Sequence, residues 1–219
     1  MTAKIKLNAA SGGGSISIQA PSSSSNNRVI DLPDIADGTL LTSQSSLDST
    51  KLSPAISAGI TEADAWKINT TFDQQAYADI TSNWSRATWG TGSLHGYKGT
   101  GMTESSGIFT FPSTGYWYVE CRLGYHARTG VSSGVGLYMK GTSDGGSNYF
   151  DLVTAWDTAV FQSGYYEWGH MNCSTIIDVT STTNCKVKFG TEASNNQVKY
   201  YTTAGGHNNL FIFLRIGDT

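Results

Sequence analysis

The residues best suited to chemistry are three acids in an aromatic-rich segment, residues 149–168: Asp151, Asp157 and Glu167. A glycan hydrolase needs two carboxylates, one that donates a proton and one that acts as base or nucleophile. Carboxylates beside aromatic rings can equally bind a sugar without cleaving it. A third interpretation is that these side chains only pack in strands and loops. The sequence leaves the three open, and we expect no catalytic residue.

Aromatic residues near these acids are the best candidates for contact with a receptor or a glycan. Residues 149–168 form the first candidate surface. Residues 192–207, which hold two asparagines and two tyrosines, form the second. The receptor-binding candidates are Tyr149, Trp156, Tyr165 and Tyr200.

Metal and cofactor chemistry finds little support in the residue pattern. Asp144, with Asn148 and Asp151, could offer oxygen ligands to calcium, but an Asp-Gly pair is more typical of an ordinary turn. The four histidines have no ligand-type residue at metal-binding spacing; they are His95, His126, His170 and His207. No phosphate-binding glycine loop and no nucleophile elbow is present. We therefore expect no metal, no cofactor and no enzymatic activity.

The cysteines are Cys121, Cys173 and Cys185. An odd number without zinc-type spacing is a poor basis for a disulfide framework. Each lies on the apolar phase of its segment, so the simplest interpretation is three buried thiols that pack as small apolar groups. A bridge between Cys173 and Cys185 stays open as the alternative.

Composition narrows the class of protein to which the chain can belong. Its 219 residues carry a formal net charge of −3, and only 14% of them are charged, so neither nucleic acid nor an anionic membrane is an expected partner. No apolar run is long enough to span a membrane, and we expect no secretory signal. There are 25 Gly and 53 Ser plus Thr, yet 11% of residues are aromatic, which favours a packed β protein.

The elements that must position these residues are β-strands, because apolar side chains alternate with a period of two from Trp66 onward. Examples are residues 117–125, 171–179, 185–189 and 210–216, which recur between turns rich in Gly, Ser and Asn. Short strands with this spacing predict an antiparallel β-sandwich.

The last predicted strand, residues 210–216, is apolar on both faces. Such a strand needs a cover on each side, and a neighbouring copy of the chain is the obvious second cover. We therefore expect a contact between copies of the chain, the homotrimer contact of the resemblance given below, that is formed by Tyr116, Tyr118, Phe211 and Phe213.

The N-terminal part differs from the rest, because residues 1–50 contain no aromatic residue. Short alternating segments there predict an extended arm, residues 1–45, that becomes ordered by adding strands to a partner; a plain disordered tail is the alternative. The predicted anchor residues are Ile5, Leu7, Ile16, Ile18, Val29, Ile30 and Leu32. Residues 46–64 form a predicted neck with a short helix, because Thr61 followed by Glu62 and Asp64 resembles a helix N-terminus. Residues 65–219 form the predicted head.

Two segments carry resemblances to known families. The segment Gly107-Ile108-Phe109-Thr110-Phe111-Pro112-Ser113-Thr114-Gly115-Tyr116 resembles the Gly-x-Phe-x-x-Pro-x-x-Gly-x-Tyr pattern of C1q/TNF-like jelly rolls. The closing segment, residues 209–214, is similar to the final apolar strand of that family. The resemblance implies an all-β jelly-roll sandwich that assembles as a trimer.

The opening segment, residues 3–21, resembles the N-termini of virion structural proteins of tailed phages, especially marine and cyanobacterial ones. Several of these proteins join such an opening to a C1q-like C-terminal domain. The resemblance implies a virion appendage made in the host cytoplasm and displayed on the particle, with the arm bound to a capsid or tail protein. The chain has no collagen-like or coiled-coil stalk, which favours a short fibre, knob or decoration protein.

Three other functions remain as alternatives. The head could be a tail-fibre module that binds a host-surface glycan or protein, it could be a virion-borne glycan hydrolase, or the chain could be a secreted C1q-like signalling ligand. The first places function in the loops of the same fold. The sparse acids speak against the second, and the expected absence of a signal peptide speaks against the third.

Overall fold

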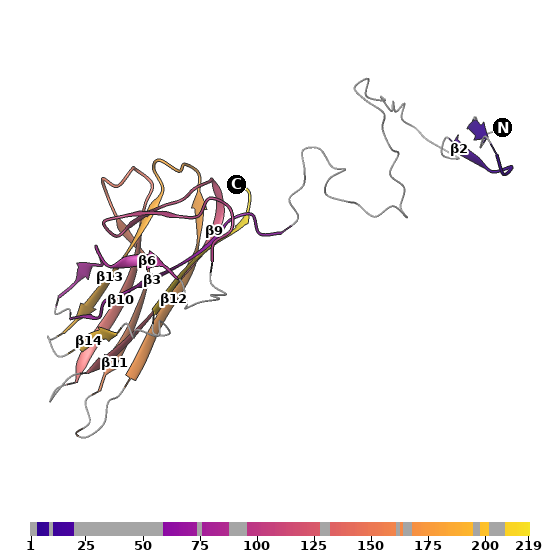
Figure 1. Cartoon of the computed structure of the whole chain (residues 1–219). Coiled ribbons are helices and arrows are strands. Elements are labelled where there is room, and N and C mark those ends of the chain that lie inside the picture. The colour runs from indigo at the N-terminus through magenta and orange to yellow at the C-terminus, as the bar shows by residue number, and fades with distance from the viewer. Residues whose placement is uncertain are drawn as a thin grey trace. The chain divides into compact units, whose positions relative to one another are not determined.

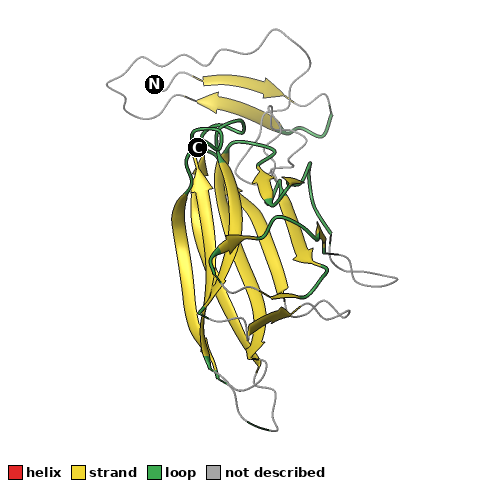
Figure 2. Cartoon of the chain, turned by 90° about the vertical axis from the view of Figure 1, so that its left-hand side faces the viewer, coloured by secondary structure: helices red, strands yellow, loops and turns green. Residues whose placement is uncertain are grey.

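The computed structural model describes residues 4–8, 11–19, 59–73, 76–87, 96–127, 132–160, 163, 168–194, 198–201 and 209–219. These residues form strands, turns and loops, and none of them is in a helix (Figure 2). The described residues therefore include no helix that is long and apolar enough to cross a membrane. The chain divides into two compact units, residues 1–48 and 49–219.

The first unit contains an antiparallel hairpin of β1 (Lys4–Asn8) and β2 (Ser15–Gln19). The turn between them contains Gly12 and Gly13, whose φ angles of 86° and 72° lie in the left-handed region that favours glycine. In this register Ile5 is opposite Ile18 and Leu7 is opposite Ile16. Because alternate positions of a strand belong to one face, these four apolar positions share a face of the hairpin.

The second unit, which we call the head, is a sandwich of two antiparallel sheets (Figure 1). The six-stranded sheet contains β5 (Ala78–Asp79), β7 (Thr103–Ser105), β8 (Ile108–Thr110), β10 (Ser133–Thr142), β11 (Phe150–Ala159) and β13 (Lys186–Ala193). Its order is β11-β10-β13-β8-β7, with β5 also paired to β13.

The seven-stranded sheet contains β3 (Ala63–Ile68), β4 (Phe72–Asp73), β6 (Trp84–Arg86), β9 (Gly115–Ala127), β12 (Trp168–Val179), β14 (Val198–Tyr201) and β15 (Asn209–Gly217). Its order is β4-β14-β9-β15-β3-β6, with β12 also paired to β9. The predicted strands of the head are thus present, and their inward side chains alternate with outward ones as the sequence pattern indicates.

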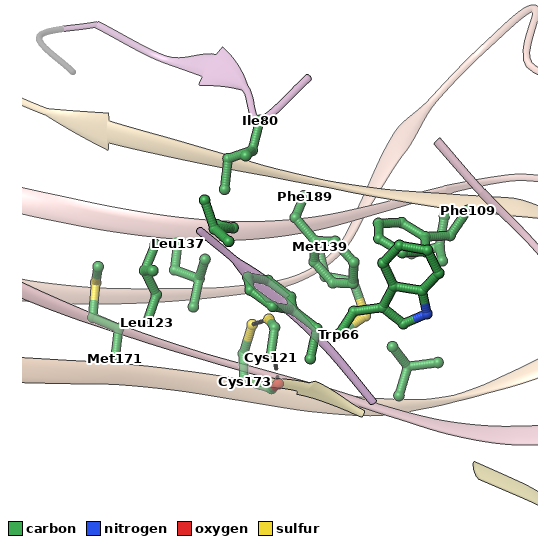
Figure 3. Packing of buried hydrophobic residues seen from close by; sticks show 14 of the residues in the cluster. Trp66, Ile80, Phe109, Cys121, Leu123, Leu137, Met139, Met171, Cys173 and Phe189 are labelled. Atoms are coloured by element: carbon green, nitrogen blue, oxygen red, sulfur yellow. Dashed lines mark hydrogen bonds between the residues drawn. The ribbon is translucent and has the colours of Figure 1, made fainter. Parts of the chain in front are cut away.

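The core lies between the two sheets and is rich in aromatic rings. Figure 3 shows Trp66 and Phe109 packed near Phe189 and Met139, which come from both sheets. The ring centroids of Phe109 and Trp66 are 5.3 Å apart at 86°, an edge-to-face geometry that stabilises aromatic pairs. This core accounts for the concentration of aromatic residues beyond residue 65.

The strand register defines two ends of the head. At one end Tyr116 is opposite Gly217, and Ala63, where the first strand of the head begins, is opposite Leu214. We call this the entry end, because the chain enters the head there. At the other end, the far end, Ala127 is opposite Val198, and β10 begins after a short connection from β9.

Two glycines of the family-like motif are required by the backbone. Gly107 has a φ of +81°, and a Cβ atom there would lie 2.1 Å from the carbonyl oxygen of Ile80. Gly115 has a φ of +132°, and a Cβ atom there would lie 2.4 Å from the carbonyl oxygen of Gly217. Each glycine combines a left-handed conformation with a close backbone approach, which explains its place in the motif.

The predicted helix of the neck is wrong where the structure describes it, because Ala63 and Asp64 belong to strand β3. The two acids do not cap a helix. Glu62 accepts hydrogen bonds from the backbone nitrogens of Thr100 and Gly101, and the buried Asp64 carboxylate accepts one from the backbone nitrogen of Met102. In both cases an acid accepts hydrogen bonds from backbone nitrogens. The sequence does not show whether those nitrogens belong to the first turn of a helix or to a distant segment, which is why the helix was predicted.

Candidate functional site: the two outer faces of the head

The outer face of the seven-stranded sheet is apolar near the entry end. Tyr118 on β9 is opposite Leu214 on β15 and Ile176 on β12, so these side chains share the outward face. Tyr116 is 42% exposed, Ile176 is 60% exposed and Ile216 is 51% exposed. A group of large apolar side chains on one open sheet face is typical of a surface that another protein covers.

This apolar surface continues over β15 and β3. Leu210 and Ile212 point outward and are half-buried. They border an open hollow of about 290 Å³ that is also lined by Ala65 and Gly96. A hollow in an apolar sheet face offers a place for a side chain of a neighbouring molecule. We call this whole area, from β12 to β3, the apolar face.

The predicted subunit contact is corrected by this geometry. Tyr116 and Tyr118 lie on the apolar face, and their contact with another subunit stays a prediction. Phe211 and Phe213 are wrong as contact residues, because both are fully buried in the core of their own chain. Strand β15 presents its phenylalanines inward and its leucines and isoleucines outward. The alternation was visible in the sequence, but aromatic size did not reveal which face was internal.

Toward the far end the same sheet becomes polar and then aromatic. The Tyr118 hydroxyl donates to Glu120 at 3.0 Å, and Arg122 follows two residues later on the same face. Beyond them, the rings of Trp168 and Tyr201 meet edge to face with centroids 4.4 Å apart. Trp168 is 47% exposed, so this second aromatic group is also accessible in a single chain.

The outer face of the six-stranded sheet carries charges and tyrosines in alternation. Lys188 forms an ion pair with Asp79 at 2.7 Å, and its ammonium lies 4.0 Å from the centre of the Tyr149 ring. Lys140 pairs with Asp151 at 3.5 Å. Although burial opposes it, the hydrogen bond from Lys188 holds the pKa of Asp79 below its usual value. These partnered charges make this face unlike the apolar one.

Near the far end, the middle strand of this face has glycine at two successive outward positions. Gly134 and Gly136 are the outward positions of β10, because Val135 and Leu137 between them are buried in the core. Trp156 on β11 and Glu192 on β13 are the cross-strand neighbours of Gly136. Because these two positions carry no side chain, the Trp156 and Tyr138 rings lie close to the backbone at Gly136, which is buried. We call this the glycine groove.

The four predicted receptor contacts have different outcomes. Trp156 is 58% exposed, and its contact with a receptor stays a prediction. Tyr149 is half-buried, and its hydroxyl is buried without a hydrogen-bond partner among the described residues. Tyr200 is wrong as a surface contact, because it is fully buried and its hydroxyl donates to the carbonyl oxygen of Glu192. Tyr165 lies outside the described residues.

Two of the acids considered for catalysis, Asp151 and Asp157, are not brought together. Asp151 and Asp157 lie on one strand six residues apart, and at about 3.3 Å per residue their backbones are separated by about 20 Å. A pair of glycosidase carboxylates lies within about 5 to 10 Å. Asp157 instead accepts a hydrogen bond from the Tyr125 hydroxyl. Glu167 lies outside the described residues.

The Asp144 carboxylate belongs to an ordinary turn. It accepts hydrogen bonds from the Thr142 hydroxyl at 2.6 Å and from the backbone and side-chain nitrogens of Asn148 at 3.1 and 2.7 Å. The bond from Thr142 leads the causes that hold its pKa well below the usual value. No group of three or more metal-ligand residues occurs in the part of the chain that the structure describes.

All three cysteines are free and buried, as the simplest interpretation predicted. Cys121 and Cys173 are directly opposite each other on β9 and β12, with their sulfur atoms 3.1 Å apart (Figure 3). The alternative bridge between Cys173 and Cys185 is not formed. Burial raises the pKa of the Cys121 thiol well above its usual value, which keeps this sulfur neutral and weakly nucleophilic.

The predicted anchor residues fall partly on the hairpin. Ile5, Leu7, Ile16 and Ile18 occupy its one apolar set of positions. Val29, Ile30 and Leu32 lie outside the described residues. A role of these positions in anchoring stays a prediction.

Comparison with known proteins identifies the fold of the head. No protein-family model matches the chain, and no curated protein matches it. Among solved structures, murine APRIL is similar with a TM-score of 0.50 and 10% identity over 71% of this chain and 98% of that chain. Eiger TNF from S. frugiperda gives a TM-score of 0.49 and 11% identity over 72% of this chain and 93% of that one.

The globular domain of zebrafish complement 1qA gives a TM-score of 0.44 and 12% identity over 74% of this chain and 100% of that chain. At these identities the likeness concerns the fold alone. The fold assignment rests on the APRIL structure, whose TM-score is 0.50. The head is an all-β sandwich of the C1q/TNF-like jelly-roll class, which confirms the fold class predicted from the sequence.

Proposed function

We propose that the chain is a structural appendage of a phage particle: a short fibre, knob or decoration protein with a trimeric head. The observation that carries the proposal is the combination, in one chain, of a virion-type opening segment with a jelly-roll head. The opening segment contains the hairpin β1–β2, and the head is the second compact unit.

The trimer is supported by the apolar face. Tyr116, Ile176 and Ile216 expose large apolar groups on one open sheet, and burying such a surface against a copy of the chain removes it from water. Three copies related by a rotation axis would cover one another's apolar faces and leave the six-stranded sheets outside. The same arrangement would present three identical arms to a particle with repeated sites, which strengthens attachment.

Anchoring through the arm is supported by the hairpin. An isolated two-stranded hairpin is marginal in water, and one with a set of apolar positions on a single face gains stability when a partner covers that face. The partner is a capsid or tail protein of the particle. The paired positions Ile5–Ile18 and Leu7–Ile16 are the central contacts in this proposal.

The test is incorporation of a truncated chain into particles. Deletion of residues 2–32 should leave a soluble trimeric head and abolish incorporation, as measured by mass spectrometry of purified particles. A matched control carries the double change Lys6→Ser and Ser17→Lys, which alters one cross-strand pair between the apolar ones and should still be incorporated. Incorporation of the truncated chain at the wild-type level would contradict the anchor assignment.

A second function, binding of a host-surface glycan or protein by the same head, is favoured by one observation. Trp156 is an exposed aromatic ring beside the glycine groove, on the sheet opposite the apolar face. Adsorption of particles to host cells should then fall when Trp156 is replaced by alanine. Full adsorption of particles that carry this variant would contradict the attachment role and would not affect the structural role.

A further inference from the structure

The glycine groove is built by the register of three strands. Gly136 has Trp156 on one side and Glu192 on the other, and Gly134 has Thr158 as its neighbour on β11. On the other side of Gly134, the backbone nitrogen of Ser194 donates to its carbonyl oxygen at 3.0 Å. The groove is thus a strip of β10 without side chains of its own, bordered by an indole, a carboxylate and two hydroxyls.

The indole of Trp156 lies against the floor of the groove. A Cβ atom at residue 136 would lie 3.0 Å from the Tyr138 ring and 3.3 Å from the Trp156 ring, so glycine gives both rings room to lie close to the strand. The two ring centroids are 5.6 Å apart at 77°. Trp156 keeps 58% of its surface exposed although its edge is held in this way. It is a rigid, open platform.

Next to the platform stands a fixed hydrogen-bond acceptor. The Tyr138 hydroxyl donates to one oxygen of the Glu192 carboxylate, which fixes the orientation of the group. The second oxygen accepts no hydrogen bond from the residues that the structure describes. The nearest ammonium along β10, that of Lys140, is already paired with Asp151 and lies 4.0 Å from the Tyr77 ring centre. The groove therefore offers negative charge and few unpaired cations.

We propose that the glycine groove binds a neutral hexopyranose residue of a glycan. The C–H face of a pyranose ring is flat and apolar and matches the open face of Trp156, and its equatorial hydroxyls can donate to Glu192. The hydroxyls of Thr158 and Ser194 can donate to or accept from further sugar hydroxyls. An acidic sugar would bring a second negative charge close to Glu192 and would bind more weakly.

The place of the groove agrees with this role. It lies at the far end of the head, away from the end at which the chain enters, and on the sheet that the proposed trimer leaves uncovered. The biological meaning of the sugar, as part of a host surface, rests on the proposed function. Binding itself does not, because the purified chain can be tested without any particle.

The experiment is a titration of the full-length ¹⁵N-labelled chain with methyl hexopyranosides of the gluco, galacto and manno series, followed by indole N–H signals in NMR. A single sugar on an open platform is expected to bind with a Kd of about 1 mM. We expect a saturable shift of the Trp156 indole signal with at least one of the three. Methyl glucuronide, which adds a carboxylate, should give a smaller shift than methyl glucoside.

Variants assign the site. Trp156→Ala should weaken binding by about tenfold or more, the factor that corresponds to ~1.4 kcal/mol. Glu192→Gln, which keeps an acceptor for Tyr138, should weaken it less. Trp168→Ala is the matched control: it removes an indole of similar exposure from the other sheet and should leave binding unchanged.

Three outcomes would overturn the proposal: no saturable shift with any of the neutral hexosides, loss of binding in Trp168→Ala but not in Trp156→Ala, or tighter binding of the glucuronide. None of these outcomes bears on incorporation into particles. Failure of the truncation experiment, in turn, leaves the sugar titration intact.

Discussion

The two outer faces of the head come from the same kind of antiparallel sheet and differ in almost every other respect. On the seven-stranded sheet, Ile176 and Tyr116 stand exposed near the entry end. On the six-stranded sheet, Lys188 and Lys140 are each paired with a carboxylate, and β10 has glycine at two outward positions. The comparison shows that the alternate positions of the strands, not the architecture, determine what each face can bind.

Covering apolar side chains on an open face with another apolar surface removes them from water and lowers the free energy of the assembly. Covering ion pairs and a fixed carboxylate with an apolar surface lowers the free energy little, because these groups are already solvated or paired. Such a face suits a small polar ligand better. The first face thus fits a copy of the chain, and the second fits solvent or a sugar.

The largest expected effect is loss of assembly on placing a charge in the apolar face. Ile176→Glu would bury a carboxylate without a partner between subunits, so we expect monomers in place of trimers in sedimentation velocity. The matched control is Thr154→Glu, an exposed strand position on the other sheet that should leave the trimer intact. If both variants sedimented as monomers, or both as trimers, the proposed difference between the two faces would be contradicted.

The next effect separates the two sides of β15. Phe213→Ala opens a cavity in the core of the chain and should lower the free energy of unfolding by about 3–5 kcal/mol. Ile212→Ala, on the outward side, should cost much less. Urea unfolding in the Ile176→Glu background measures both without a contribution from assembly. A larger loss for Ile212→Ala would mean that the strand faces are reversed.

This strand shows how far the sequence could lead. The period of two and the turn spacing predicted the strands and the sandwich, because side-chain alternation is a local property. Which side of β15 is internal depends on the size of the space between the sheets, which no local pattern contains. The phenylalanines fill that space, and the shorter Leu210, Ile212 and Leu214 remain outside.

Two other sites show the same limit. Asp64 resembles a helix-capping acid, yet besides Ala65 and Trp66 next to it, its carboxylate binds the Met102 backbone and the Arg86 side chain, 38 and 22 residues further along the chain. The glycine groove was equally hidden: Trp156 was a candidate by type, but its neighbours Gly136 and Glu192 are brought beside it only by strand register. Contacts between distant strands require the fold itself.

A third prediction concerns alkaline pH and the tyrosines of the six-stranded face. Burial and hydrogen bonds to Asp79 and Glu192 raise the pKa values of Tyr77 and Tyr138 above the ordinary 10.0. A raised folded-state pKa contributes stability that is complete below about pH 10 and is lost as pH rises further. The urea midpoint should therefore fall above pH 10, and Glu192→Gln should reduce this dependence. A flat profile from pH 9 to 11 would contradict it.

The smallest effect is expected from the charge pairs of the same face. Lys188→Met removes the partner of Asp79 while keeping the length of the side chain, and the pair is partly exposed, so we expect a loss of about 1 kcal/mol or less. The loss should shrink at high salt and as pH falls below about 4, where the carboxylate of Asp79 is protonated in the unfolded chain and then in the folded one. Assembly should not change, since this face is the uncovered one.

The most direct test of the contrast between the faces is hydroxyl-radical footprinting of the assembled chain, with the Ile176→Glu monomer as reference. We predict that Tyr116 is protected in the wild-type assembly and becomes reactive in the monomer, whereas Trp156 reacts equally in both. Protection of Trp156 together with full reactivity of Tyr116 in the wild-type protein would contradict the account.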